Sequence, residues 1–178
     1  SLVGSEMCKE TVHQLATEYR FFHWHLEFPH ILTDGGREGG PGWDGGFDVI
    51  LGNPPWDHVE MKEVEFFAVR APEIAGSSGA KRKSLIAQLG TADPFFYDEF
   101  ERSKRQFDSS RHMYANAGLY PLTGRGRIKT DSVFAELGRK LQNPSGRFGM
   151  ILPTGIATDA TTQYFFKDLV QTLSLIHI

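Results

Sequence analysis

Apolar residues follow a helical spacing in some parts of the chain and form short continuous runs in others. Near the start, the helical spacing predicts an amphipathic helix that ends near Arg20 and includes Cys8, Val12, Leu15, Ala16 and Tyr19. The aromatic stretch 21–28 then predicts a strand, which Pro29 ends. A glycine-rich run at 35–46 leads into the next strand, whereas a phosphate-binding loop follows a strand and leads into a helix. The run therefore predicts a flexible loop and disfavours a phosphate-binding loop.

Two later apolar runs, at 47–52 and 147–152, predict buried strands, and a proline follows each of them closely. Helical spacing around these runs predicts helices near 61–68, 81–89, 94–107, 130–141 and 159–170. Thr130 or Asp131 can cap the fourth helix, and Asp159 can cap the last one. The expected apolar faces of these two helices are Val133, Phe134, Leu137 and Leu141, and Phe165, Phe166, Leu169 and Val170. Strands that alternate with helices predict an α/β fold with a mostly parallel sheet.

A rigid polar turn, Asn53-Pro54-Pro55-Trp56, follows the first of these strands. The two prolines fix φ and lack backbone donors, so the turn cannot become helical and its carbonyl groups stay available as acceptors. Asn53 adds an amide that accepts and donates, and Trp56 adds a flat face on which a planar ring can stack. Such a turn at the carboxyl end of a strand suits an exocyclic amino group on an aromatic base. A purely structural turn is the alternative.

The strand and turn together, Phe-Asp-Val-Ile-Leu-Gly-Asn-Pro-Pro-Trp, resemble motif IV of the amino-methyltransferases. They are similar to this motif in the adenine-N6 DNA methyltransferases of large restriction-modification and phage-defence proteins. The stretches 22–29, 118–127, 134–137 and 146–159 resemble the segments that flank the motif in this family. The resemblance runs from about Phe21 to Val170. It implies part of a Rossmann-like, S-adenosylmethionine-dependent methyltransferase fold.

The resemblance also implies roles for the residues of the turn. The Asn53 side-chain oxygen and the Pro54 backbone carbonyl would accept hydrogen bonds from adenine N6, Pro55 would stiffen the turn, and Trp56 would stack on a base rotated out of the duplex. The N6 lone pair is delocalised into the ring, so the nitrogen is a poor nucleophile until its protons are drawn outward. Positioning and hydrogen bonding would then supply most of the catalysis.

Only part of such an enzyme is covered. The family holds its cofactor with a Gly-rich loop after an earlier strand and an acidic residue on the next strand, and neither pattern occurs here. Asn53 and Glu27 are the candidate cofactor contacts, although Glu27 does not clearly align with the family's acidic residue. We expect a helix and lead-in strand with a Gly-rich loop at 1–46, and the catalytic half of the domain with a helical insertion at 47–172. A longer chain or partner subunits would supply the cofactor loop and target recognition, so we expect the chain to be inactive alone.

Charge is unevenly distributed along the chain, whose formal net charge is −3. Residues 1–50 contain three Lys or Arg and eight Asp or Glu, whereas residues 81–147 contain thirteen and seven. The later part is therefore the expected side for DNA phosphate. Arg125, Arg127 and Lys129 precede a predicted helix and are candidate phosphate contacts. A plain basic turn is the alternative.

With 178 residues and 40% hydrophobic content, the chain can form one sizeable core. Its single cysteine, Cys8, excludes a disulfide framework and is expected in the core. Neither a membrane span nor a signal peptide is visible, so we expect a prokaryotic cytoplasmic protein. His23, His25 and His30 lie close together, but further ligands at a suitable spacing are missing, so we predict no metal site.

The last six residues, 173–178, read Leu-Ser-Leu-Ile-His-Ile. They can be encoded by a sequence that resembles a transposon-end adapter, so we expect a non-native tail. An ordinary apolar strand is the alternative.

The sequence thus predicts methyl transfer from S-adenosylmethionine to adenine N6 in DNA, within a restriction-modification or phage-defence system. Protein-glutamine and some RNA methyltransferases share the Asn-Pro-Pro-aromatic pattern, although the basic insertion at 81–129 favours nucleic acid. A catalytically silent DNA-binding or scaffold subunit with the same fold is the rival from another class. Cofactor binding would separate the rival from the enzyme.

Overall fold

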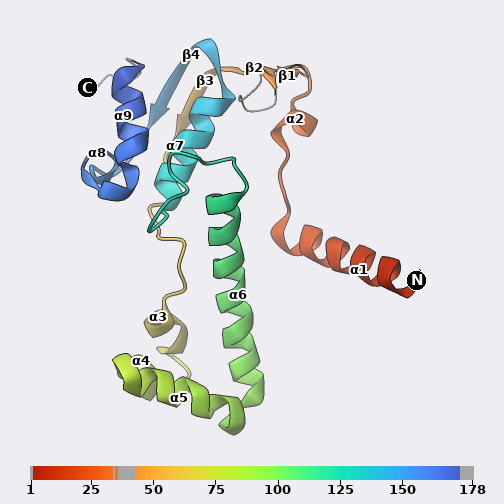
Figure 1. The fold of residues 1–178 in the computed structure, drawn as a ribbon, viewed down its shortest axis with the longest axis vertical. Coiled ribbons are helices and arrows are strands. Elements are labelled where there is room, and N and C mark those ends of the chain that lie inside the picture. Colours follow the sequence, from red (N-terminus) through yellow and green to blue (C-terminus); the bar gives the residue numbers. More distant parts are fainter. Residues whose placement is uncertain (1, 34, 36–42, 173–178) are drawn as a thin grey trace.

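The computed structural model describes residues 2–33, 35 and 43–172 (Figure 1). The expected tail at 173–178 and most of the expected glycine-rich loop lie outside these residues, as does the Cys8 side chain. The first half of the chain forms α1 (Leu2–Tyr19), α2 (Trp24–Glu27), β1 (Leu32–Thr33), β2 (Asp44–Gly45), β3 (Phe47–Gly52), α3 (Glu63–Phe67), α4 (Pro72–Ala75) and α5 (Gly79–Ala92). The second half forms α6 (Pro94–Asn116), α7 (Thr130–Leu141), β4 (Gln142–Met150), α8 (Gly155–Thr158), the 3-10 helix η1 (Ala160–Thr162) and α9 (Gln163–Gln171).

Strands β3 and β4 pair in parallel, as the alternation of strands and helices predicts. The register places Val49 beside Arg147 and Gly52 beside Met150, with an irregularity between Phe47 and Val49. This pair and the short antiparallel pair β1–β2 are the two sheets of the described residues. The small parallel sheet within a largely helical chain fits an α/β methyltransferase-like fold.

Helices α7 and α9 cover one face of the β3–β4 pair. Gly138 of α7 lies directly against the ring of Phe148, where a Cβ would have no room. Further along β4, Met150 packs against the buried residues Ala135 of α7 and Phe165 of α9. Because side chains alternate along a strand, Phe148 and Met150 point to the same face of the sheet.

The opposite face of the sheet is open in the described structure. Val49 and Leu51 of β3 are 58% and 78% exposed, and Ile151, just after β4, is 60% exposed. Parallel sheets are normally covered on both faces, and for this reason their strands are apolar on both sides. Within the described residues, this apolar face of the sheet therefore has no covering layer.

The helices between β3 and α7 have a hydrophobic core of their own. Figure 1 shows α5 at the end of the molecule farthest from the sheet and α6 leading back toward α7. At the start of α6, the Asp93 carboxylate caps the helix by accepting a hydrogen bond from the Phe96 amide at 3.0 Å. The buried members of the core are Phe67, Ala71, Ile74, Phe96 and Phe100. Helices were predicted in this part of the chain, near 61–68, 81–89 and 94–107.

The prediction of a lead-in strand over 21–28 is wrong. This stretch forms the short helix α2, and the first strand is β1, only two residues long. Trp24 and Phe28, four residues apart, stack with ring centroids 5.9 Å apart, which is a helical neighbour relation. Both rings also contact the ring of Phe47 at the start of β3. The aromatic residues are therefore spaced to pack a compact turn onto β3.

Several helix boundaries differ from the predictions. Helix α6 continues to Asn116 instead of ending near 107, and Pro72 begins α4, five residues after α3 ends at Phe67. Neither Thr130 nor Asp131 caps α7, because the N-cap residue is Lys129, with no side-chain cap. Asp159 makes no cap either; its carboxylate pairs with Lys129 instead. Phe134 and Val170, expected on apolar faces, are exposed.

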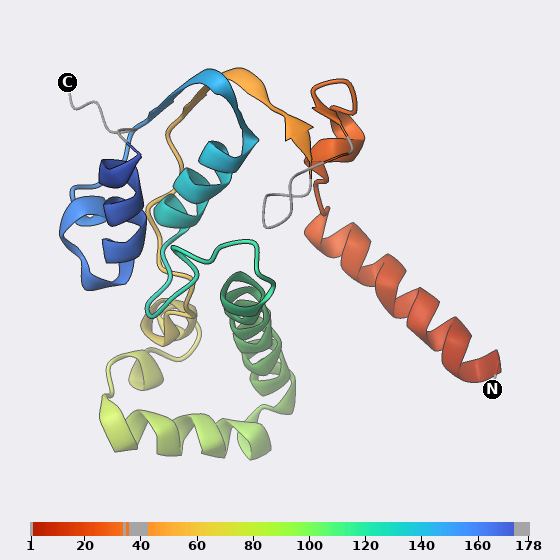
Figure 2. The ribbon, with the colours of Figure 1, turned by 45° about the horizontal axis from the view of Figure 1, so that its top comes forward.

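Helix α1 extends away from the rest of the molecule in both views (Figures 1 and 2). It is confirmed as a helix ending at Tyr19, one residue before the predicted end. Among the described helices, none combines the length and the apolar character needed to cross a membrane.

Candidate active site at the carboxyl end of β3

The turn formed by residues 53–56, called the 53–56 turn below, begins where β3 ends. The Ile151 amide donates to the Gly52 carbonyl at 3.0 Å, so pairing with the β4 side continues up to the residue before Asn53. Pro54 is buried, whereas Asn53 and Pro55 are exposed and Trp56 is 54% exposed. The buried proline thus fixes the turn to the body of the protein, and the amide and indole remain accessible to a ligand.

Thr130, the first residue of α7, fastens the end of the turn. Its hydroxyl donates to the Pro55 carbonyl at 2.7 Å and accepts from the Asp57 amide at 3.1 Å. The Thr130 amide donates in turn to the Asp57 carbonyl at 2.9 Å. The residues before and after Trp56 are therefore both held by one residue of α7.

The acceptors of the turn differ in what they bind. The Pro55 carbonyl is occupied by the Thr130 hydroxyl. Neither the Asn53 side chain nor the Pro54 carbonyl has a hydrogen-bond partner among the residues that the structure describes. These are the two groups that the motif predicts as acceptors for an amino group, and both remain available.

Two ion pairs surround the turn. Arg127 binds Glu60, with the guanidinium Nε 3.1 Å from Oε2. The hydrogen bond from Arg127 is the main cause that lowers the pKa of Glu60 below its usual value. Lys129 binds Asp159, which lies between α8 and η1. Two of the three predicted phosphate contacts are thus engaged with carboxylates of the chain itself.

The third predicted phosphate contact, Arg125, has no carboxylate partner in the described residues. Its Nε donates to the Pro121 carbonyl at 2.7 Å, and its guanidinium lies 4.7 Å from the ring centroid of Tyr164. The structure therefore brings Arg127 and Lys129 close to the turn, while Arg125 packs against the 121 carbonyl and α9.

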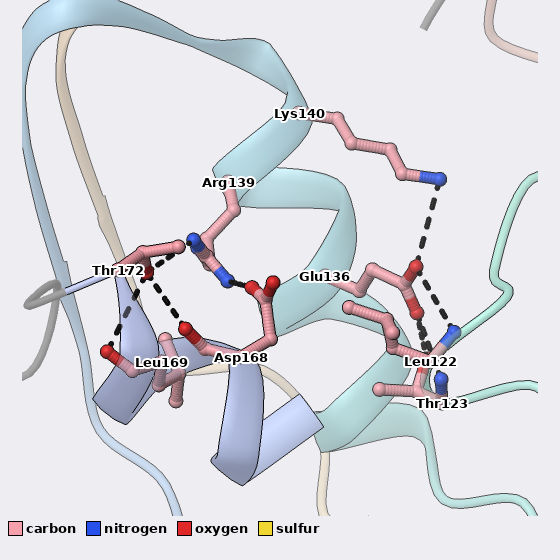
Figure 3. A network of polar contacts seen from close by, with 8 residues as sticks. All are labelled: Leu122, Thr123, Glu136, Arg139, Lys140, Asp168, Leu169 and Thr172. Carbon is pink, nitrogen blue, oxygen red and sulfur yellow. Dashed lines mark hydrogen bonds and ion pairs between the residues drawn. The ribbon is translucent and has the colours of Figure 1, made fainter. Parts of the chain in front are cut away.

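Helix α7 supports this arrangement through a polar network (Figure 3). The buried Glu136 carboxylate accepts from the Thr123 amide at 2.8 Å, the Thr123 hydroxyl at 2.7 Å and the Leu122 amide at 3.3 Å. On the other side of the helix, Arg139 pairs with Asp168 of α9. One helix therefore fixes the loop before 125–130, the helix α9 and, through Thr130, the 53–56 turn.

Two buried polar atoms near the turn have no hydrogen-bond partner in the described part of the chain, Nδ1 of His58 and Oδ1 of Asp131. Burial raises the pKa of the Asp131 carboxyl, and the charges of Lys129 and His58 oppose that shift. A hollow of about 400 Å³ lies beside the segment after Trp56. The carboxylates of Asp57, Glu60 and Glu65 line it, so it disfavours phosphate.

Glu27, the other candidate cofactor contact, is not near Asn53. It is exposed on α2, whose aromatic residues pack against Phe47 at the start of β3. Asn53 follows the other end of this six-residue strand, about 17 Å away along the strand at ~3.3 Å per residue. Within the described residues no group of three or more His, Cys, Asp or Glu is placed to hold a metal ion.

Sequence reasoning missed the contribution of Thr130 and the partners Glu60 and Asp159. Thr130 stands at a predicted helix start, which indicated a cap and not a contact with a turn 75 residues earlier. In the sequence, nothing distinguishes Glu60 and Asp159 from other acidic residues. The antiparallel bridge between His58 and Lys129 brings Glu60 to Arg127, and the contact of Asp159 with Lys129 spans 30 positions, so no local pattern indicates either pair.

A comparison with known protein families finds a match that includes this turn. The model of the Eco57I restriction-modification methylase family matches residues 4–89, which include β3 and the whole 53–56 turn. No curated protein and no solved structure matches the chain. Over these residues the chain is therefore similar to methyltransferases of the restriction-modification kind.

Proposed function

We propose that the 53–56 turn holds the target base in an adenine-N6 DNA methyltransferase of a restriction-modification or phage-defence system in the prokaryotic cytoplasm. This proposal rests on one observation, namely which hydrogen-bond acceptors of the turn are already occupied. The Pro55 carbonyl is used internally, while the Asn53 side chain and the Pro54 carbonyl have no partner in the described structure. Two acceptors next to an exposed indole suit an amino group on a flat ring.

The two acceptors would act on the two protons of adenine N6. Hydrogen bonds from N6 to the Asn53 oxygen and the Pro54 carbonyl draw those protons out of the ring plane. The lone pair then becomes available for attack on the methyl group. Because the prolines hold the acceptors in place before the base arrives, little reorganisation is needed during the reaction.

Trp56 would stack on the base after it leaves the duplex. Rotating a base out of the stack costs a few kcal/mol, and stacking on an aromatic side chain returns about 1–3 kcal/mol. The indole is accessible, and the residues on both sides of it are tied to Thr130. Its face can therefore be presented without first ordering the loop.

Methyltransferases of this kind generally use S-adenosylmethionine, which would supply the methyl group. The described residues offer Asn53 to such a cofactor but no Gly-rich loop between a strand and a helix, and Glu27 lies at the far end of β3. The sheet face at Val49, Leu51 and Ile151 is exposed, and because parallel sheets are normally covered on both faces, this supports the presence of further protein on this side. We infer that a longer chain or a partner subunit completes the cofactor pocket and target recognition, and that this chain is inactive without them.

DNA phosphate is assigned to the basic part of the chain away from the acidic hollow. Arg125 is the first candidate, because it has no carboxylate partner in the described residues. Arg127 and Lys129 would have to exchange Glu60 and Asp159 for phosphate oxygens. Their contribution to affinity would therefore be reduced by the loss of those ion pairs.

The experiment replaces Asn53 by Ala, with Asn53→Asp as the matched variant, in the complete protein that carries this chain. Asn53→Ala should lower the rate of methyl transfer into DNA by at least about a hundredfold, the scale of losing one preorganised polar contact. Asn53→Asp keeps an acceptor oxygen and should retain more activity. DNA binding should stay at the wild-type level in both variants. A wild-type rate for Asn53→Ala would remove Asn53 from the mechanism.

A further inference from the structure

We infer that Thr130 is a positioning residue, which aims Trp56 and keeps the Pro55 carbonyl out of the acceptor set. This inference rests on the proposed function. The Thr130 hydroxyl spans the two residues that flank Trp56, donating to the Pro55 carbonyl at 2.7 Å and accepting from the Asp57 amide at 3.1 Å. A hydroxyl can donate and accept at the same time, so one side chain satisfies both.

The backbone around Trp56 has no comparable support from the turn itself. The prolines restrict φ at positions 54 and 55, but Trp56 and Asp57 have no such restriction. The backbone bond from the Thr130 amide to the Asp57 carbonyl starts a short antiparallel pairing. It continues in the bridge between His58 and Lys129 and in the bond from the Val59 amide to the Ile128 carbonyl at 3.0 Å. Among the residues that the structure describes, the Thr130 side chain alone extends this pairing across Trp56 to Pro55.

The Thr130 hydroxyl is directed away from the body of its own helix. Lys129, one position earlier, is the N-cap residue of α7 and provides no side-chain cap. Thr130 is the first residue of the helix, and its hydroxyl points to the 53–56 turn. The start of α7 therefore provides a contact to the turn.

Thr130 is itself held firmly, which a positioning residue requires. The Ser132 hydroxyl donates to the Lys129 carbonyl at 2.9 Å, and the Lys129 ammonium binds Asp159. The next residue, Asp131, is buried. Movement of Thr130 would disturb these contacts together, so its hydroxyl can serve as a fixed reference point for the turn.

The consequence for catalysis concerns both the indole and the acceptors. Without the hydroxyl, the Pro55 carbonyl becomes a further free acceptor beside the Asn53 side chain and the Pro54 carbonyl. Trp56 also loses the fixed backbone on its Pro55 side. An amino group could then bind in more than one way, and fewer of the bound bases would be correctly aligned for transfer.

The test compares Thr130→Val, which keeps the shape but lacks the hydroxyl, with Thr130→Ser, which keeps the hydroxyl. Hydrogen exchange of the Asp57 amide reports the contact directly. In Thr130→Val it should be about three- to tenfold faster than in wild type, the factor expected for one lost hydrogen bond. Thr130→Ser should restore the wild-type rate. Thr17→Val, on the exposed face of α1, is the control for the Thr-to-Val change.

Kinetics in the complete protein give the second measurement. Thr130→Val should lower kcat about ten- to a hundredfold and leave KM for DNA within about twofold, because misalignment acts after binding. Thr130→Ser should recover kcat. If Thr130→Val does not fold, as judged by circular dichroism, Thr130→Ala replaces it.

Two outcomes overturn the inference. Unchanged Asp57 exchange in Thr130→Val would show that the hydroxyl does not hold the turn. Faster exchange with an unchanged kcat would reduce Thr130 to a structural contact. If wild type itself methylates no adenine, the proposed function fails, whereas the exchange measurement still decides whether Thr130 holds the backbone around Trp56.

Discussion

At the scale of single residues, neighbouring backbone carbonyls in the 53–56 turn differ in whether they are hydrogen-bonded, and the proposed function depends on this difference. The carbonyl of Pro55 accepts a hydroxyl from α7, while that of Pro54 has no partner in the described structure. A tight turn offers several acceptors that a substrate amino group could use. Internal occupation of the Pro55 carbonyl removes it from that set, while the Pro54 carbonyl and the Asn53 side chain stay in it.

Trp56 gives the first prediction at this scale. Trp56→Ala should lose about 1–3 kcal/mol of stabilisation of the extruded base, which corresponds to roughly five- to 150-fold. Trp56→Phe keeps an aromatic face and should retain most of it. A fluorescent adenine analogue at the target position measures extrusion directly, because unstacking increases its emission.

The control for Trp56 is the exposed Phe95 at the start of α6, which is remote from the turn. Phe95→Ala should leave the emission unchanged. Equal emission with wild type and Trp56→Ala would contradict the stacking role.

The prediction of the strand before the turn is confirmed, because its signal is local. The strand and the turn are contiguous, so the place of the turn after β3 could be predicted directly, while the roles of its residues stay predictions. Thr130 could not be found in this way, because its contact with Pro55 spans 75 positions. The exposed position of Glu27 on α2, away from Asn53, depends on the packing of Trp24 and Phe28 against Phe47. The sequence could not predict this position either.

At the scale of elements, α7 connects the sheet, α9, the preceding loop and the turn. Figure 3 shows Glu136 on this helix directed to the loop residues Leu122 and Thr123, with Arg139 directed to Asp168. The helix and its general position between two strands were predicted, and Val133 and Leu141 of its expected apolar face are buried. Phe134 was expected inside and is exposed, while the charged Glu136 is buried because the loop amides satisfy its oxygens.

Glu136→Gln provides a prediction for this element. The substitution keeps the shape but replaces one acceptor oxygen by an NH₂ donor, which would face an amide or hydroxyl donor of the loop. The free energy of unfolding should fall by about 1–3 kcal/mol, the cost of leaving a buried polar group unsatisfied. Urea denaturation followed by circular dichroism measures this change.

Glu99→Gln is the matched control for Glu136→Gln, because Glu99 is exposed and forms an ion pair with Arg70. It should change the free energy of unfolding by less than about 1 kcal/mol, since exposed ion pairs contribute little. Equal effects of the two substitutions would contradict the importance assigned to the buried network.

At the scale of the whole molecule, the structure consists of a sheet region with α7 to α9 on one face, a separately packed helical insertion, and α1 extending away (Figures 1 and 2). The parallel pairing of β3 and β4 was predictable, because a strand, several helices and a second strand follow each other. The separate core of the insertion was not, since it depends on contacts among α3 to α6 that the helical spacing of each one does not reveal. The sheet face opposite α7 and α9 is apolar and has no covering layer in the described structure.

The central claim is that the 53–56 turn serves methyl transfer to adenine N6 in DNA. The most direct measurement incubates the complete protein with DNA and S-adenosylmethionine carrying a labelled methyl group, followed by digestion and mass spectrometry of the nucleosides. We predict that the label appears in N6-methyladenine. Label in a cytosine derivative, in RNA or in a protein glutamine would contradict it, as would the absence of any methylated product.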